Sequence, residues 1–480
     1  MNTKHPNIIF FLIDGLRADQ CYGKGKTSVT PNLDGLIQKG TYFTNAYSSV
    51  DGTIISLNTI FNGDFQIGNA ARYQKVSLKQ NNLIDVLKKN GYRVYGSLPN
   101  FASFNTLLQQ FENKTDEQIK GKNEEVDPVA AQFKQEKIEG SHSEYERNKA
   151  TFPTGLTQKI IQILESTEKQ EPYFCYFHIF DLHPLREGKM PIGIEDFGDE
   201  EYGNSTYAKT VSSIDFWLGK ILENINLDNT ILILTSDHGE RIPYDNVRAV
   251  DFEPKLENTV SIGKKILPKS AHNMGGKFLY NIRKSVGKRK LEKSNETLTN
   301  YEKRSRETFD NVSLFDEMLH VPLLFANNQI KSKIITGNVH HTDVLPTLCN
   351  LANIKLTHKV NGRNLIPLTE KNGFEDVPIY IRTRPYVDPT PDKRDSKGIR
   401  TDEYKYFRFA RNPNENVHLY NLKDDPYENE NIAEKNKELI SQFEEKISKF
   451  EKNNLSDEED DISEEEKKRI SSELKRLGYM

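Results

Sequence analysis

The sequence predicts an α/β protein with a large, mostly parallel sheet flanked by helices, and a smaller C-terminal α+β subdomain with a short antiparallel sheet. Two continuously apolar runs, residues 7–14 and 230–238, are typical of parallel strands buried on both faces. Helical and strand patterns alternate along the chain up to Leu365, which indicates a sheet covered on both sides. Beyond Leu365 the segments become shorter and indicate the antiparallel sheet.

The alternation can be followed element by element. Helices are expected over residues 32–39, 83–89, 158–166 and 211–224, and strands over 7–14, 91–96 and 173–180 and from Thr230. The fourth helix places Ile214, Trp217, Leu218 and Leu222 on one face, as a helix packed on a sheet would. In the C-terminal part, strands are expected over 377–383, 398–408 and 417–422, followed by a helix over 433–449.

Composition limits the class of protein. The chain has 480 residues, of which 35% are hydrophobic and 28% charged, and its formal net charge is −4. This near-neutral balance gives no support to nucleic-acid binding. The first six residues are polar and no apolar stretch reaches 18 residues, so we expect neither a secretory signal nor a membrane span. A cytoplasmic protein is the resulting prediction. Cys175 and Cys349 lie in apolar contexts, and we expect them to be reduced core residues.

Polar side chains follow two of the predicted strands at the point where each strand ends. Asp14 ends the first apolar run, and Asp237 with His238 ends the run from Thr230. Ligands gather beyond the carboxyl ends of parallel strands, so these three side chains could converge on one cation. Two carboxylates and an imidazole suit a divalent metal. For a single aspartate at a strand end, capping of the next turn is the commoner role.

A third segment supplies a hydroxyl group. Residues 48–63 run from a small polar loop into a short apolar helical pattern that Gly63 closes. Thr53 therefore sits at the predicted N-terminus of a helix, where free N–H groups and the helix dipole favour an anion.

Together these features resemble the sulfatase branch of the alkaline phosphatase superfamily. The matching motifs, in the family's order, are Pro6-Asn7 with Asp14–Asp19, residues 30–34 and 41–47, Thr235–Glu240, Val321–Leu324, Thr342–Thr347, Gly362-Arg363, Arg400–Tyr406, and Leu419–Leu422 with Asp425-Pro426. The resemblance covers most of the chain. It implies an alkaline phosphatase-like fold and a metal-dependent enzyme.

The departures from the family pattern bear on the chemistry. Sulfatases carry a cysteine or serine, converted to formylglycine, in a Cys/Ser-x-Pro-x-Arg signature. Thr53 stands at that position, the Pro and Arg are missing, and threonine cannot become formylglycine. Asp14-Gly15 replaces the Asp-Asp of many sulfatases and is similar to the nucleotide pyrophosphatase/phosphodiesterase branch. We therefore expect a hydrolase or phospho-group transferase acting on phosphodiester or phosphonate esters through a Thr53 nucleophile.

The resemblance also implies roles for further residues. Asp14, Asp237, His238 and Thr53 would hold one divalent ion (Mn, Zn, Ca or Mg), and a second ion is possible if Asp181, His183 and His272 converge. His183 would donate to the substrate anion or protonate the leaving group. Arg17, His272 and Lys277 are the other expected substrate contacts, although Arg17 could instead pair with Asp19 or Asp34. His178 is expected to be a core histidine, His340-His341 to have a surface or capping role, and His320 to have no role.

The predicted organisation has three parts. Residues 1–365 would form the catalytic domain, with charged insertions at about 112–149 and 241–306; residues 366–450 would form the C-terminal subdomain, and 451–480 an acidic stretch with a terminal helix. The basic second insertion could close over an anionic substrate or be a solvated helical excursion. We expect the terminal helix to dock through Ile470, Leu474 and Leu477.

Two other functions remain open. One is a sulfuric ester hydrolase that works without formylglycine, and the other is a non-catalytic protein that keeps the sulfatase fold for binding. In the enzymatic hypotheses the partner is a small-molecule or glycan-linked anionic ester.

Overall fold

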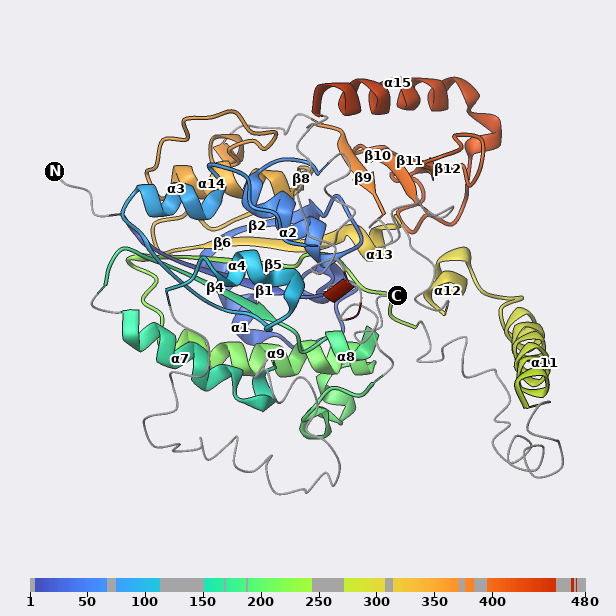
Figure 1. Ribbon diagram of the computed structural model, residues 1–480, viewed down its shortest axis with the longest axis horizontal. Coiled ribbons are helices and arrows are strands. Elements are labelled where there is room, and N and C mark those ends of the chain that lie inside the picture. The colour runs from blue at the N-terminus through green and yellow to red at the C-terminus, as the bar shows by residue number, and fades with distance from the viewer. Residues whose placement is uncertain are drawn as a thin grey trace.

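The computed structural model describes most of the chain, and Figure 1 shows its arrangement. The described residues are 5–66, 75–112, 151–167, 170–186, 189–243, 272–306, 314–370, 376–383 and 395–454, with positions 468, 469 and 472; the side chains of 272–280 are not included. The predicted insertion at 112–149 and the docking residues Ile470, Leu474 and Leu477 therefore lie almost entirely outside the described part.

The large sheet has eight strands in the order β3-β4-β1-β5-β6-β2-β7, with β8 also paired to β2. Their bounds are β1 Asn7–Ile13, β2 Gly40–Tyr47, β3 Arg93–Ser97, β4 Tyr173–Ile179, β5 Thr230–Thr235, β6 His320–Ala326, β7 Lys333–Ile335 and β8 Val339–His340. Strands β3, β4, β1 and β5 are mutually parallel, and β6 runs antiparallel to β5 and β2. The mixed, mostly parallel sheet confirms the prediction.

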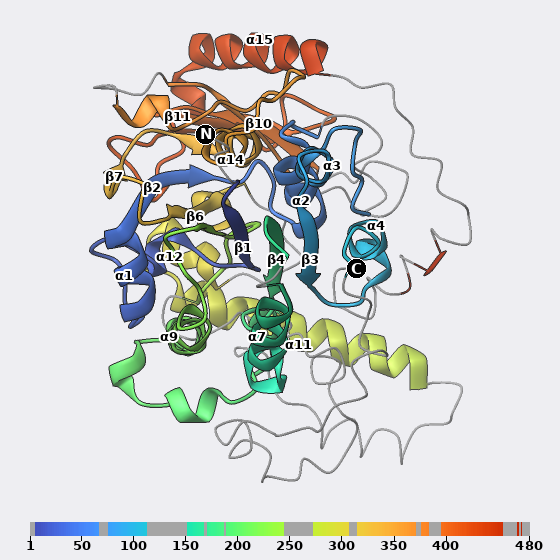
Figure 2. The ribbon, with the colours of Figure 1, turned by 90° about the vertical axis from the view of Figure 1, so that its left-hand side faces the viewer.

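Helices cover both faces of this sheet. The α-helices of the described part of the chain are α1 Pro31–Lys39, α2 Thr53–Asn62, α3 Leu83–Lys89, α4 Asn105–Leu108, α7 Leu156–Thr167, α8 His183–Arg186, α9 Thr206–Leu222, α11 His272–Ser294, α12 Asn300–Ser305, α13 Asp316–Leu319, α14 Val344–Leu351 and α15 Lys437–Asn454. Figures 1 and 2 show α2, α3 and α14 on one side of the sheet, and α7 and α9 on the other. In the described part of the chain, no helix is long and apolar enough to span a membrane.

Burial on both faces explains the unbroken apolar run of β1. Its side chains alternate between two cores: Ile8, Phe10 and Leu12 belong to the core under α2, α3 and α14. Ile9, Phe11 and Ile13 belong to the core under α1, α7 and α9. Each residue of the strand is therefore buried, and a polar position is tolerated only where the strand ends.

A four-stranded antiparallel sheet follows, in the order β12-β11-β10-β9, with α15 on its outer face (Figures 1 and 2). The strands are β9 Ile379–Arg382, β10 Ser396–Arg400, β11 Tyr404–Phe409 and β12 His418–Asn421. The single strand expected over 398–408 is wrong, because the chain turns back at Thr401. The Thr401 Oγ1 accepts from the Tyr404 N–H at 2.9 Å, and this bond helps close a β10–β11 hairpin.

Buried ion pairs connect the small sheet to the main body. The Lys405 ammonium on β11 is fully buried and donates to Asp316 Oδ1 at 2.6 Å and to Glu428 Oε1 at 2.7 Å. The Arg400 guanidinium on β10 pairs with Asp316 at 3.0 Å and lies 3.5 Å from the ring centre of Tyr47 on β2. Since Asp316 begins α13 and Tyr47 ends β2, these contacts fix the small sheet against the large one.

We predict that Lys405→Met destabilises the protein by about 3–5 kcal/mol, because it leaves the buried Glu428 carboxylate without its cation, whereas Asp316 keeps its pair with Arg400. Urea unfolding measures the change. Lys423→Met is the matched control on the same subdomain, since the Lys423–Glu403 pair is largely exposed, and it should shift stability by no more than about 0.5 kcal/mol. Equal effects of the two substitutions would contradict the assignment of Lys405 to a buried network.

Candidate functional site

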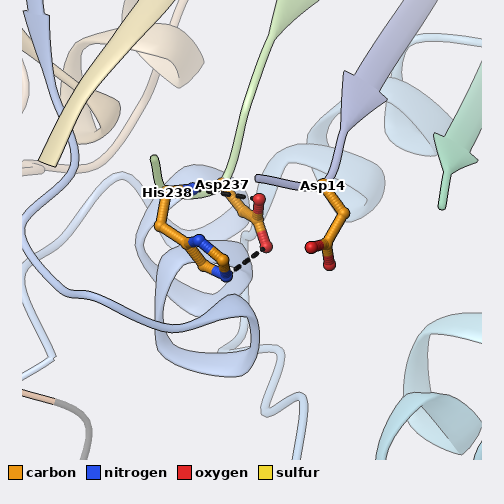
Figure 3. A group of neighbouring side chains, drawn as sticks. All are labelled: Asp14, Asp237 and His238. Carbon is orange, nitrogen blue, oxygen red and sulfur yellow. Dashed lines mark hydrogen bonds and ion pairs between the residues drawn. The ribbon is translucent and has the colours of Figure 1, made fainter. Parts of the chain in front are cut away.

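Three side chains at the carboxyl edge of the large sheet form one buried group. Asp14 follows β1, and Asp237 with His238 follows the neighbouring parallel strand β5. One ligand atom from each residue lies within 4.8 Å of the others. Figure 3 shows the side chains gathered beyond the ends of the two strands. The structure thus brings together the three side chains that the sequence analysis expects to converge beyond the strand ends.

The Asp237 carboxylate has one satisfied and one unsatisfied oxygen. Its Oδ1 accepts from the N–H groups of Gly15 at 3.1 Å and His238 at 2.9 Å. Its Oδ2 is fully buried, has no hydrogen-bond donor among the described residues, and lies 3.4 Å from His238 Nε2. A buried carboxylate oxygen without a donor is costly unless a cation neutralises it. Gly15 makes this turn possible with φ +73°, which favours glycine.

The His238 ring presents a lone pair to the same space. Its Nδ1 donates to the Gly239 carbonyl at 2.7 Å, so Nε2 carries the lone pair in the neutral ring. Burial lowers the pKa of His238, but the charges of Asp237 and Asp14 outweigh it and the pKa is raised overall. The bond from Nδ1 to Gly239 directs Nε2 toward the two carboxylates, which is the orientation of a metal ligand.

The hydroxyl of Thr53 lies against these groups. Thr53 is the first residue of α2, and its Oγ1 is 3.2 Å from Asp14 Oδ2 and 3.3 Å from His238 Nε2. Helix α2 ends at Gly63 with φ +66°, as the closing glycine predicts. The geometry thus brings a buried hydroxyl, two carboxylates and an imidazole into one cluster at a helix N-terminus.

His178 is a core residue, as expected, but it also contacts the cluster, which the sequence analysis missed. Its Nε2 lies 3.7 Å from Asp14 Oδ2, and its Nδ1 bonds the Tyr176 hydroxyl at 3.1 Å. Burial raises the pKa of Asp14, but His178, His238 and His183 lower it, and the net shift is downward. Strand β4 pairs with β1 with His178 opposite Leu12, so a correct strand order was the missing signal.

Helix α8 brings two basic groups near the cluster. His183 is buried at the start of this helix and is one of the groups that lower the pKa of Asp14. Arg186 ends the helix, and its Nη1 lies 3.3 Å from His238 Nε2. Arg186 was not among the residues picked from the sequence, because only His183 belongs to the motif.

Arg17 forms a salt bridge with Asp19, which was the alternative to a substrate contact in the sequence analysis. Its guanidinium pairs with Asp19, and it also contacts the Glu240 carbonyl at 3.3 Å and the Tyr301 hydroxyl at 3.1 Å. Asp34 pairs instead with Lys26. Arg17 lines a cavity of about 120 Å³ together with residues of α12, α13 and the 426–428 loop.

The other residues named from the sequence fall in three groups. His272 and Lys277 lie in α11, and their side chains are outside the described part. The Asp181 carboxylate accepts from the Phe152 N–H at 3.1 and 3.2 Å, and burial raises its pKa to about 8. The surface position considered for His340 and His341 is wrong, since both are buried. His340 does cap the turn at 341–343.

The donor set fits a divalent metal. Carboxylate, imidazole and hydroxyl donors suit Mn²⁺, Zn²⁺, Mg²⁺ or Ca²⁺. The orphaned Asp237 oxygen and the Nε2 lone pair of His238 both face the space that such an ion would fill. Asp14, Asp237, His238 and the Thr53 hydroxyl are the residues that would hold it.

Comparisons with known proteins give a consistent result. The family model described as Sulfatase matches residues 6–354, and that of N-sulphoglucosamine sulphohydrolase, C-terminal, matches 305–453. Arylsulfatase K of Rattus norvegicus is 21% identical over 451 residues, covering 90% of this chain and 76% of that protein. The ulvan-active sulfatase of Formosa agariphila is 23% identical over 465 residues, with the same coverage of 90% and 76%.

Solved structures support the fold. A 2-O GAG sulfatase superposes with a TM-score of 0.60 at 17% identity, covering 97% of this chain and 96% of that one. The phosphonate monoester hydrolase of Agrobacterium radiobacter gives 0.58 at 16% identity, covering 94% and 96%. These likenesses confirm the alkaline phosphatase-like architecture.

We predict that Mn²⁺ stabilises the protein and that Asp237→Asn abolishes the effect. At a concentration 100-fold above Kd, an ion that binds only the folded state adds about 2.7 kcal/mol to the free energy of unfolding. Thermal unfolding with and without the ion measures this. Asp215→Asn is a control, since Asp215 is a buried carboxylate that bonds Asn32 and Leu33 instead. Stabilisation that persists in Asp237→Asn would contradict the assigned site.

Proposed function

Because the chain belongs to the sulfatase family, we propose that it is a metal-dependent hydrolase that cleaves a sulfate ester at the Asp14, Asp237 and His238 cluster. The observation that carries the proposal is the position of the Thr53 hydroxyl, 3.2 Å from Asp14 Oδ2 and 3.3 Å from His238 Nε2. A nucleophile, its activating groups and an anion-binding helix end are thereby assembled at one point.

The relatives favour sulfate over phosphate. The relatives named above are an arylsulfatase and a sulfatase active on ulvan, and the C-terminal family model is that of a sulphohydrolase. They support the sulfate-ester alternative of the sequence analysis better than its first hypothesis. We take the substrate to be a sulfate ester on a small molecule or a glycan.

The residues of the cluster divide the work among themselves. A divalent ion held there supplies Lewis-acid chemistry, lowering the pKa of a bound hydroxyl and neutralising charge on the ester. Thr53 Oγ1 is the nucleophile: it gives its proton to Asp14 Oδ2 and bonds the sulfur as the ester's alcohol leaves, and water then cleaves the sulfated threonine to release sulfate. The free N–H groups at the start of α2 face the anion. His183 is the group we assign to the leaving oxygen, as a proton donor.

A second candidate rests on the chemistry of Thr53 itself. Formylglycine arises from cysteine or serine, and the Pro and Arg of the sulfatase signature are missing here. A threonine hydroxyl that attacks phosphorus forms a phosphothreonine, which water or another hydroxyl then resolves. A phosphodiester or phosphonate-ester hydrolase, or a phospho-group transferase, is therefore the candidate that this side chain favours.

Paired aryl substrates separate the two candidates. We expect the purified protein with Mn²⁺ to hydrolyse an aryl sulfate faster than the matching aryl phosphodiester. Thr53→Ala should lower kcat by at least about 10³-fold, because it removes the nucleophile, while Thr53→Ser should retain part of the rate. Thr59→Ala is the control in the same helix, since the Thr59 hydroxyl bonds the Ile55 carbonyl, and its rate should stay within a few-fold.

The other outcomes are equally informative. Faster turnover of the phosphodiester would overturn the sulfate proposal in favour of the second candidate. A rate no higher than that of the uncatalysed reaction, and unchanged in Thr53→Ala, would contradict both and would leave the non-catalytic binding hypothesis.

A further inference from the structure

Arg186 places a guanidinium directly against a metal-ligand candidate. It ends the short helix α8, is half-buried, and holds Nη1 3.3 Å from His238 Nε2. His238 Nε2 itself lies 3.4 Å from Asp237 Oδ2 and 3.3 Å from Thr53 Oγ1. The guanidinium is thus at the edge of the space that the cluster encloses.

The tautomer of His238 determines what this contact means. Because Nδ1 is committed to the Gly239 carbonyl, Nε2 has only its lone pair, and Arg186 donates to it. One lone pair cannot both bind a metal ion and accept this hydrogen bond. An ion at the cluster therefore takes this acceptor away from the Nη1 N–H of Arg186, and the guanidinium then lies beside the ion's ligand His238.

We propose that Arg186 binds a non-bridging oxygen of the substrate's ester group, next to the nucleophile Thr53. This inference rests on the proposed function and identifies the residue that recognises the anion. A guanidinium presents a planar fork of N–H donors that matches two oxygens of a sulfuryl or phosphoryl group. Since His183 begins the helix that Arg186 ends, α8 contributes both groups from the same side of the cluster.

Two binding measurements on the full-length protein test the role of Arg186. Calorimetric titration with inorganic sulfate, in the presence of Mn²⁺, should show a Kd at least about 10-fold weaker in Arg186→Gln, because a charged hydrogen bond is lost. Titration with Mn²⁺ alone should show unchanged or tighter binding, because the competitor for His238 Nε2 and a neighbouring positive charge are gone. Arg186→Lys, which keeps the charge without the fork, should give an intermediate sulfate affinity.

Arg93→Gln is the matched control and should change neither affinity, since Arg93 begins β3, at the end away from the cluster, and pairs with Glu112 at the surface. Weaker binding of Mn²⁺ and sulfate together in Arg186→Gln would overturn the proposal, because a structural residue would have that effect. Unchanged sulfate binding would also overturn it.

Turnover completes the test and separates this inference from the proposed function. The kcat/KM for an aryl sulfate or an aryl phosphodiester should fall in Arg186→Gln, mainly through a higher KM, because the guanidinium no longer binds the ester's oxygens. If neither ester is hydrolysed but sulfate binding still depends on Arg186, the proposed function fails and the assignment of Arg186 stands. If an ester is hydrolysed with the same KM in Arg186→Gln, the assignment of Arg186 fails alone.

Discussion

Two buried carboxylates at the ends of neighbouring parallel strands are the constraint on which the rest of this structure depends. The pairing of β1 with β5 brings Asp14 and Asp237 to one edge of the sheet, where the apolar cores on both faces exclude water. Two like charges in such a place are costly unless positive charge or hydrogen-bond donors surround them. The glycine turn, the helix N-terminus and the basic side chains nearby all reduce the cost of burying these two charges.

The two carboxylates are bonded differently, and this difference gives the cluster its chemistry. Asp237 Oδ1 is satisfied by backbone N–H groups, which fixes its carboxylate and leaves Oδ2 directed into the cluster. Asp14 Oδ2 faces the hydroxyl of Thr53 on one side and His178 on the other. The remaining oxygen and nitrogen lone pairs point to a common centre, as in a site that is preorganised for a cation.

The sequence predicted the sheet and the convergence well, for physical reasons. Burial on both faces of β1 forces an uninterrupted apolar run, so the polar Asp14 that ends the run is conspicuous. The sequence analysis failed where a contact depends on packing between separate segments of the chain. His178 meets Asp14 only because β4 lies beside β1, and Arg186 meets His238 only because α8, which follows β4, lies beside the residues that follow β5. Likewise, one predicted strand proved to be the β10–β11 hairpin, whose turn at Thr401 has no glycine or proline to mark it.

The central claim is that a divalent ion sits between Asp14, Asp237, His238 and Thr53. Anomalous diffraction from crystals soaked in Mn²⁺ tests it most directly. The account predicts one strong peak within coordination distance of both carboxylates, the His238 Nε2 and the Thr53 hydroxyl. No peak at this position, with the four side chains ordered and the ion bound elsewhere, would contradict it.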